Sequence, residues 1–185
     1  MRVDEYGKYV QILSYRLREE VEPKAFIEAA RNACSPTAVQ FLDAEALISE
    51  KHLFFATLNA IKAFKQGRNI AQSLDIEILL YASAQKQIGE AIHSVGLRPR
   101  TSLMAVVLVG EDEAATALAT KRLQTIVPGD QDQSILCLAD QKKIAVLNQL
   151  YGINAAEVGA LSRMNNKEAL QWLIIERAAL LDVKR

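Results

Sequence analysis

The chain has 185 residues, of which 50% are hydrophobic and 24% are charged, and its 22 Lys and Arg residues balance its 22 Asp and Glu residues. This composition is typical of a globular protein and excludes a disordered chain. The balanced charge also excludes a protein that coats long duplexes with its whole surface, since such proteins carry a basic excess. Any contact with nucleic acid is therefore expected to be local, and we expect a single domain over residues 1–185.

The two cysteines and the N-terminus give no indication of a special compartment. Cys34 and Cys137 lie far apart and form no C-x-x-C pair, so they indicate neither a redox motif nor a zinc finger, and we expect buried structural thiols. Residues 1–5 lack the apolar stretch of a signal peptide, and the longest apolar runs are too short for a membrane span. We expect a cytoplasmic protein, nuclear as well in a eukaryote, with no membrane contact, metal or cofactor.

The first third of the chain predicts strands and helices in alternation. Pro23 suits the first position of a helix, Pro36 stops that helix, and Ser49 is a typical N-cap for the next one. Apolar residues with period 2 precede and follow the first helix. The expected elements are a strand at 10–17, a helix at 23–34, a strand at 39–42 and a helix from 49 to 67.

The stretch from Asn69 to Leu97 predicts two short helices in a bent hairpin. Ser73 is the expected N-cap, and the apolar residues from 74 to 84 surround the helix, so we expect burial on more than one side. A buried strand over 76–81 is the competing interpretation. The next helix shows clean helical spacing, and Gly96 is expected to end it as a left-handed residue.

In the second half, residues 103–109 form the strongest predicted strand. Apolar residues at both parities place it in the middle of a sheet that is covered on both faces. Pro128-Gly129-Asp130 breaks the chain, and residues 135–138 are expected to form an edge strand. Helices follow from Asp140 and from two expected capping boxes, Asn154 with Glu157 and Asn165 with Glu168.

This alternation favours a layered α/β sandwich in which a small mixed β-sheet is flanked by helices on both faces. An α+β fold is the alternative.

The helix from Ser49 carries lysines on one face. Lys51, Lys62 and Lys65 fall within about 60° of one another at 100° per residue, and Arg68 and Asn69 follow the helix end. Cations beside a polar turn and the start of the next helix can bind an anion, although a solvated lysine face is the commoner explanation. With small and apolar neighbours, the end of a single-stranded RNA could bind there. The candidate residues are Lys51, His52, Lys62, Lys65, Arg68, Asn69, Ile70, Ala71 and Ser73, with Arg98 and Arg100 as a possible basic rim.

The terminal helix carries apolar residues over a wide arc. Such a helix either lies within its own domain or presents a face to a partner. Trp172 is an attractive anchor because tryptophan is enriched in interface hot spots. The candidate partner-binding residues are Leu170, Trp172, Leu173, Ile174 and Arg177.

Catalytic residues are sparse. His52 and His93 are the only histidines, and no H-E-x-x-H, G-x-S-x-G or glycine-rich phosphate motif occurs. We therefore expect no catalytic residue and no enzyme. Two alternatives remain open: a small-molecule enzyme that uses His93 or Cys137, and a DNA-binding regulator with a helix-turn-helix-like segment from Tyr151, although Arg163 and Lys167 supply little charge for a duplex.

An ordered set of residues makes the chain resemble a known family. The set comprises His52, the run 60–67, Asn69-Ile70-Ala71, Glu77-Ile78-Leu79-Leu80-Tyr81, Gln87-Ile88, Ala91-Ile92, Gly96 and the terminal run 176–181. It is similar to the kinase-binding subunits of the KEOPS (EKC) tRNA-modification complex, the TPRKB or PRPK-binding protein family. Residues 123–133 form a longer segment than the family pattern needs.

The resemblance implies a non-catalytic accessory subunit. Such subunits dock on the N-terminal lobe of the complex's small atypical kinase-ATPase, of the Bud or PRPK type. They also recruit tRNA through its single-stranded CCA 3′ end for threonylcarbamoyladenosine modification. The residues that match the family in this RNA role are Lys62, Arg68, Asn69, Ile70, Ala71 and Ser73.

Overall fold

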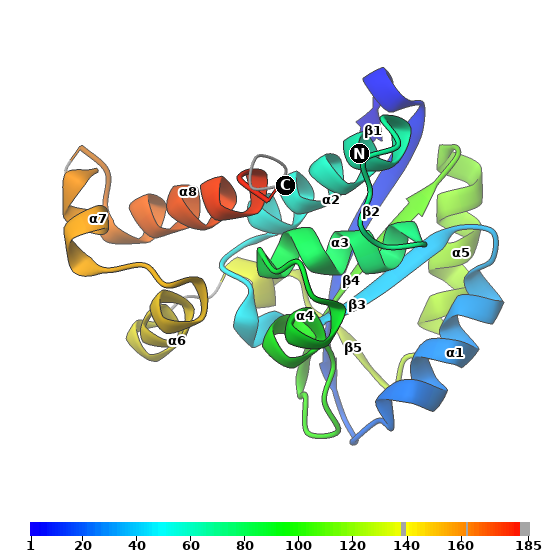
Figure 1. Ribbon diagram of the computed structural model, residues 1–185. Helices are drawn as coiled ribbons and strands as arrows, with labels where there is room; N and C mark the ends of the chain where they lie inside the picture. The colour runs from blue at the N-terminus through cyan, green and yellow to red at the C-terminus, as the bar shows by residue number, and fades with distance from the viewer. Residues whose placement is uncertain (138–139, 162, 182–185) are drawn as a thin grey trace.

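A twisted antiparallel sheet forms the middle layer of the molecule (Figure 1). The computed structural model describes residues 1–137, 140–161 and 163–181. Within them the strands follow the order β1-β2-β4-β3, and β5 also pairs with β2. Their bounds are β1 Arg2–Val3, β2 Lys8–Leu17, β3 Ala38–Asp43, β4 Leu103–Gly110 and β5 Gly129–Gln131.

Every strand pairing in the described residues is antiparallel. β4 pairs with β2 from Tyr9↔Gly110 to Arg16↔Leu103, and β3 pairs with the other edge of β4. Strands β2 and β3 therefore run in the same direction, but β4 lies between them and no parallel pair forms. The layered α/β arrangement is confirmed, whereas the sheet is antiparallel in its pairings and not mixed.

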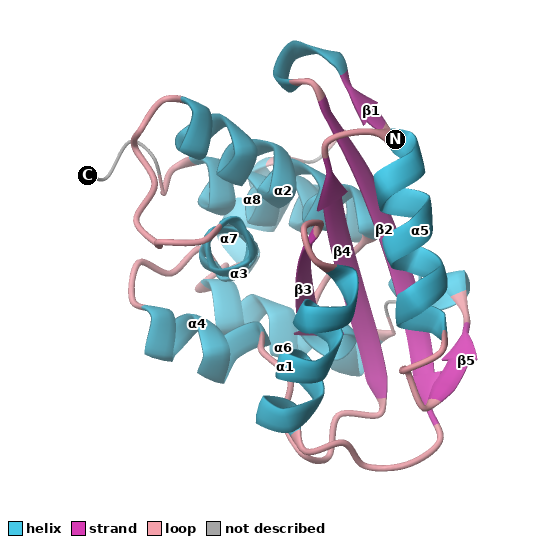
Figure 2. Cartoon of the chain, turned by 90° about the vertical axis from the view of Figure 1, so that its right-hand side faces the viewer, coloured by secondary structure: helices cyan, strands magenta, loops and turns pink. Residues whose placement is uncertain are grey.

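Helices cover both faces of the sheet (Figure 2). Helices α1 (Pro23–Cys34) and α5 (Glu113–Gln124) lie on one face. Helices α2 (Glu50–Lys65), α3 (Leu74–Ser83) and α4 (Ile88–Val95) lie on the other. The expected hairpin of two helices is confirmed, and the strand interpretation of residues 76–81 is excluded.

The central strand explains this layering. Met104, Val106 and Leu108 of β4 pack into the cluster with α1 and α5. Ala105, Val107 and Val109 point to the other face and pack into the cluster with α2, α3 and α4. Because both parities are apolar, both faces of β4 are buried, as the sequence predicts.

Three further helices extend the layer that contains α2 and α3. They are α6 (Gln141–Tyr151), α7 (Ala155–Ala160) and α8 (Asn166–Ala179), and α8 packs against α2, α3, α6 and α7. The capping box of Asn154 and Glu157 is confirmed. Asn165 also caps its helix, but the Glu168 carboxylate bonds to the Asn165 side-chain amide and not to its backbone. No helix in these ranges is both long and apolar enough to cross a membrane.

The expected edge strand lies earlier than predicted. Gln133–Cys137 forms a 3₁₀ helix, η3, and Leu138 lies outside the described residues. The strand is instead β5, directly after the chain break at Pro128. A Cβ atom on Gly129 would lie 2.5 Å from the carbonyl oxygen of Arg16, so glycine permits the close approach to β2.

Two local expectations also differ from the structure. Gly96 is extended, with φ −74° and ψ 163°, and forms a β-bridge with Leu42 instead of a left-handed cap. The buried-thiol prediction holds for Cys34 but is wrong for Cys137, which is exposed as the last residue of η3.

Candidate functional site

Seven of the nine predicted RNA-binding residues, all except Lys51 and His52, lie near the corner where α2 ends and α3 begins (Figure 1). Residues 65–70 are all exposed, and Gly67 adopts the left-handed conformation with φ 63° that reverses the chain after α2. Ser73 occupies the N-cap position of α3 and is exposed, but its hydroxyl makes no capping hydrogen bond. We call residues 66–73 the corner turn.

A buried carboxylate holds the corner turn in place. Oε2 of Glu77 accepts hydrogen bonds from the backbone N–H groups of Ile70, at 2.9 Å, and Ala71, at 2.7 Å. The Asn69 side-chain amide donates to the carbonyl oxygen of Ala71 at 2.9 Å. The Ala71 side chain is buried, whereas Ile70 is 39% exposed. The turn therefore presents an apolar side chain to solvent on a fixed backbone.

Glu77 lies in the first turn of α3, and the sequence alone did not reveal this bond. Helix-start acids are normally solvated, but Glu77 is fully buried. The sequence signal for a buried Glu77 is its position between Ile76 and Ile78, since an acid that is buried within an apolar run needs an internal hydrogen-bond partner.

The three lysines share one face of α2 but lie at its two ends. Lys51 and Lys65 are separated by 14 residues, which is about 21 Å along a helix. The Lys51 ammonium lies 4.0 Å from the centre of the Trp172 ring, on α8. The compact basic group at the corner therefore consists of Lys62, Lys65 and Arg68, and the structure does not bring Lys51 to it.

The corner lysines are not neutralised by acids of the described residues. Lys65 donates to the backbone carbonyl of Glu5 at 3.0 Å and lies 5.2 Å from the centre of the Tyr6 ring. Neither Lys62 nor Lys65 forms an ion pair with an acidic side chain in that part of the protein. Arg68 is exposed, and its guanidinium donates a hydrogen bond to the side-chain oxygen of Gln66.

His52 lies in the interior and is not part of this surface. Its side chain is fully buried, with the ring edge-on to Tyr151 at a centroid distance of 5.7 Å. Neither ring nitrogen has a hydrogen-bond partner among the described residues. Burial lowers the pKa of His52 to about 4, so the imidazole is neutral at pH 7. One residue along a helix is 100° of rotation, which turns His52 inward from the lysine face.

Most of the predicted partner residues of α8 belong to the chain's own core. Leu170, Leu173 and Ile174 are at most 8% exposed and pack against α6. Arg177 forms an ion pair with Glu157 of α7. For these residues the structure agrees with the alternative that α8 packs within its own domain, because α6 and α7 cover its apolar side chains.

Trp172 is the member of that group that remains at the surface. It is 37% exposed, and its ring lies 6.2 Å from that of the half-buried Phe55. Phe55, Trp172 and Lys51 together form a small aromatic and basic surface where α2 meets α8.

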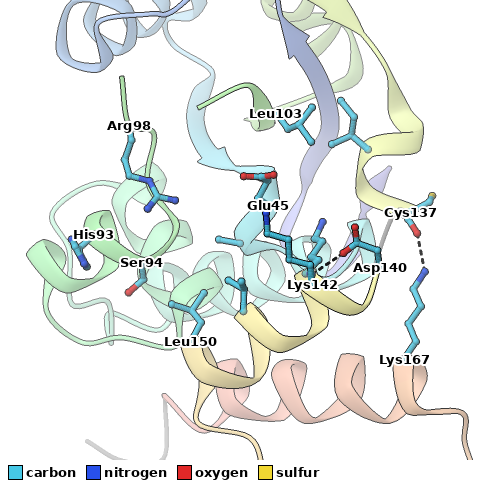
Figure 3. Close-up of a pocket in the computed structure, with 14 residues that line it drawn as sticks. Glu45, His93, Ser94, Arg98, Leu103, Cys137, Asp140, Lys142, Leu150 and Lys167 are labelled. Carbon is cyan, nitrogen blue, oxygen red and sulfur yellow. Dashed lines mark hydrogen bonds between the residues drawn. The ribbon is translucent and has the colours of Figure 1, made fainter. Parts of the chain in front are cut away.

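A cavity with a volume of about 860 Å³ lies between α4, η3 and α6 (Figure 3). Both His93 and Cys137 line it, but they lie on opposite sides of the cavity. No group of three His, Cys, Asp or Glu side chains within the described ranges could hold a metal ion. Arg98, an expected member of the RNA rim, is instead paired with Asp43 at this cavity.

Comparison with known proteins agrees with the family resemblance. The model of the family described as "Kinase binding protein CGI-121" matches residues 19–182. The KEOPS complex subunit Cgi121 of Pyrococcus abyssi is 33% identical over 113 residues, which are 58% of this chain and 63% of that protein. The regulatory protein Cgi121 of Methanocaldococcus jannaschii is 33% identical over 104 residues, which are 56% of this chain and 63% of that protein.

The chain thus spans about 63% of the length of these curated relatives. The family model, in contrast, covers the chain from α1 onward, which includes β3, β4, β5 and the helices from α1 to α8. The chain therefore belongs to the CGI-121 family of kinase binding proteins.

Proposed function

We propose that this protein is a non-catalytic accessory subunit of a KEOPS complex that binds the complex's small kinase-ATPase and the CCA 3′ end of tRNA. It would thereby bring tRNA to the enzyme that forms threonylcarbamoyladenosine, in the cytoplasm. Membership in the kinase-binding family and the name of the Pyrococcus relative, a KEOPS complex subunit, support the assembly.

The corner turn carries the RNA part of this proposal. Proteins that bind single strands combine cations for the phosphates with flat or apolar side chains for the bases. Ile70 offers such an apolar surface on a backbone that Glu77 fixes, and Lys62, Lys65 and Arg68 lie beside it. This local basic group suits a protein without net charge, because it needs to contact only a short single strand.

The test is a double charge reversal, Lys62→Glu with Lys65→Glu, compared with Lys24→Glu with Lys121→Glu. The control lysines are exposed on α1 and α5, on the opposite face of the sheet. We expect the corner variant to bind tRNA at least tenfold more weakly in a gel shift, because phosphate contacts dominate such affinities. Both variants should retain the kinase in a pull-down.

An unchanged tRNA affinity of the corner variant would remove the corner from the RNA site. An equal loss in the control variant would show that total charge, not the corner, determines binding.

The Trp172 surface supports the kinase part of the proposal. Tryptophan is enriched among the residues that contribute most to binding at protein interfaces, and Trp172 is 37% exposed. Phe55 and Lys51, both on α2, complete this surface next to Trp172.

We propose no catalytic role for the chain and no duplex binding. A Cys–His pair needs its side chains within hydrogen-bond reach, but His93 and Cys137 lie on opposite sides of their cavity. In the helix-turn-helix-like segment, the Lys167 ammonium already bonds to the carbonyl oxygen of Cys137. A duplex titration at low salt should therefore show no binding.

A further inference from the structure

The cavity between α4 and α6 is used by neither the RNA nor the kinase proposal (Figure 3). Its volume of about 860 Å³ falls in the range of sites that bind small organic molecules, about 300–1,000 Å³. Leu103, Ile135, Val146 and Leu150 give it an apolar lining, and Val146 is 49% exposed. Exposed apolar surface inside a concave site is a typical feature of ligand pockets.

Three lysines from two helix starts also line the cavity. Lys142 and Lys143 lie in the first turn of α6, and Lys167 lies in the first turn of α8. The positive end of a helix dipole disfavours cations at these positions. Helix stability therefore does not account for the lysines. Lys143 and Lys167 each bond to a backbone carbonyl, and an anion in the cavity would favour all three.

Lys143 is the most enclosed of the three. Its ammonium donates to the carbonyl oxygen of Ala44 at 2.9 Å, and burial lowers its pKa although Glu45, Asp43 and Asp140 raise it. The positive charge of Lys167 lowers the pKa of Lys143 further.

The carboxylates of Glu45 and Asp140 line the cavity beside the lysines, and within the described residues neither forms an ion pair with Lys142, Lys143 or Lys167. The carboxylate of Asp43, which also raises the pKa of Lys143, is already engaged. Asp43 accepts from the Arg98 guanidinium at 2.6 Å and from the backbone N–H of Glu45 at 3.0 Å. The Lys142 side chain is exposed, and it has neither a hydrogen bond nor an ion pair with the described part of the chain. Lys142 and Lys143 are thus available to an anion from the solvent, with apolar surface next to them.

We propose that this cavity binds a small amphipathic organic anion, with its carboxylate or phosphate head at Lys142 and Lys143 and its apolar body against Val146 and Leu150. The head would displace water from the exposed Lys142 ammonium and replace the carbonyl contact of Lys143 by a charge-assisted bond. The body would cover the exposed part of Val146.

The test separates head from body with four probes in isothermal titration calorimetry: octyl phosphate, octanoate, octanol and inorganic phosphate. We expect octyl phosphate or octanoate to bind at least tenfold more tightly than both octanol and inorganic phosphate. The tighter of the two anions identifies the preferred head group. If octanol binds as tightly as both anions, or no probe binds, the proposal is overturned.

Variants assign the binding to this cavity. Lys142→Met with Lys143→Met should weaken the preferred anion at least tenfold and leave octanol unchanged. Val146→Trp should occupy the space proposed for the apolar body and weaken the preferred anion at least tenfold. The matched controls are Lys121→Met and Leu118→Trp on α5, where Leu118 is 51% exposed. Should the double variant fail to fold, Lys142→Met alone changes an exposed side chain and tests the same head group. Unchanged affinity in the folded cavity variants would overturn the assignment.

Discussion

The carboxylate of Glu77 accepts a hydrogen bond of 2.7 Å from the backbone N–H of Ala71, six residues earlier in the chain. A buried acid in the first turn of α3 thus determines the shape of a turn at the surface. A buried N–H group without an acceptor is costly, so this bond leaves the corner turn few alternative conformations. The same bond links the stability of the fold to the exposed position of Ile70.

Glu77→Ala should therefore destabilise the protein by about 3 kcal/mol, because two backbone N–H groups lose a charged acceptor. Glu77→Gln keeps one carbonyl oxygen and should cost less. Urea unfolding measures both, with Glu90→Ala on the surface of α4 as a control that should stay within about 0.5 kcal/mol of the wild type. A loss for Glu77→Ala no larger than the control's would contradict the role of this bond.

His52 makes stability depend on pH. Its pKa is about 4 in the folded protein and about 6.5 when unfolded, so the unfolded state binds the proton more readily. Stability is then complete above about pH 6.5 and is lost as the pH falls toward 4, by about 3 kcal/mol. His52→Leu should flatten this part of the pH profile in urea unfolding, whereas the exposed His93→Leu should retain it.

The same variant checks the position of His52. A fully buried side chain cannot touch RNA, so His52→Leu should change the tRNA affinity by less than twofold at pH 7. A larger loss with the fold intact would place His52 at the binding surface.

Lys51→Glu and Lys62→Glu should separate the two ends of α2. Lys62 belongs to the corner, whereas Lys51 lies over the Trp172 ring about 17 Å farther along the helix. We expect Lys62→Glu to weaken tRNA binding severalfold and Lys51→Glu to weaken it less than twofold at 0.15 M salt, where the Debye length is about 8 Å. Equal losses would mean that the RNA covers the whole length of α2.

Trp172→Ala and Leu173→Ala should separate the surface of α8 from its core. Truncation of the exposed Trp172 should weaken kinase capture at least tenfold while the protein stays folded. Leu173→Ala removes a buried side chain and should cost about 2–4 kcal/mol of stability with little direct effect on the interface. Full kinase capture by folded Trp172→Ala would place the interface elsewhere.

The sequence was sufficient for those parts of the fold that depend on local patterns. The helix starts at Pro23, Ser49 and Asn154 and the two-sided burial of β4 follow from capping chemistry and apolar periodicity, and the structure has them. Gly96 was misjudged because its conformation depends on the β-bridge to Leu42, 54 positions away in the chain. A contact of that range leaves no local signal.

The site divides in the same way. Angular spacing on a helix correctly placed Lys51, Lys62 and Lys65 on one face, but it ignores the axial distance, which separates Lys51 from the others. It also could not show that α6 and α7 cover the apolar arc of α8, since that depends on tertiary packing. The burial of His52 and the hydrogen bonds of Glu77 also depend on tertiary packing, so the sequence alone could not reveal them.

The most direct test of the proposed function is the affinity of the protein for tRNA with and without its CCA end, measured at one fixed salt concentration. If the corner turn binds the single-stranded end, removal of CCA should weaken wild-type binding at least tenfold, and the Lys62→Glu, Lys65→Glu variant should lose most of this difference. Equal affinity of the wild type for both RNAs would contradict the account.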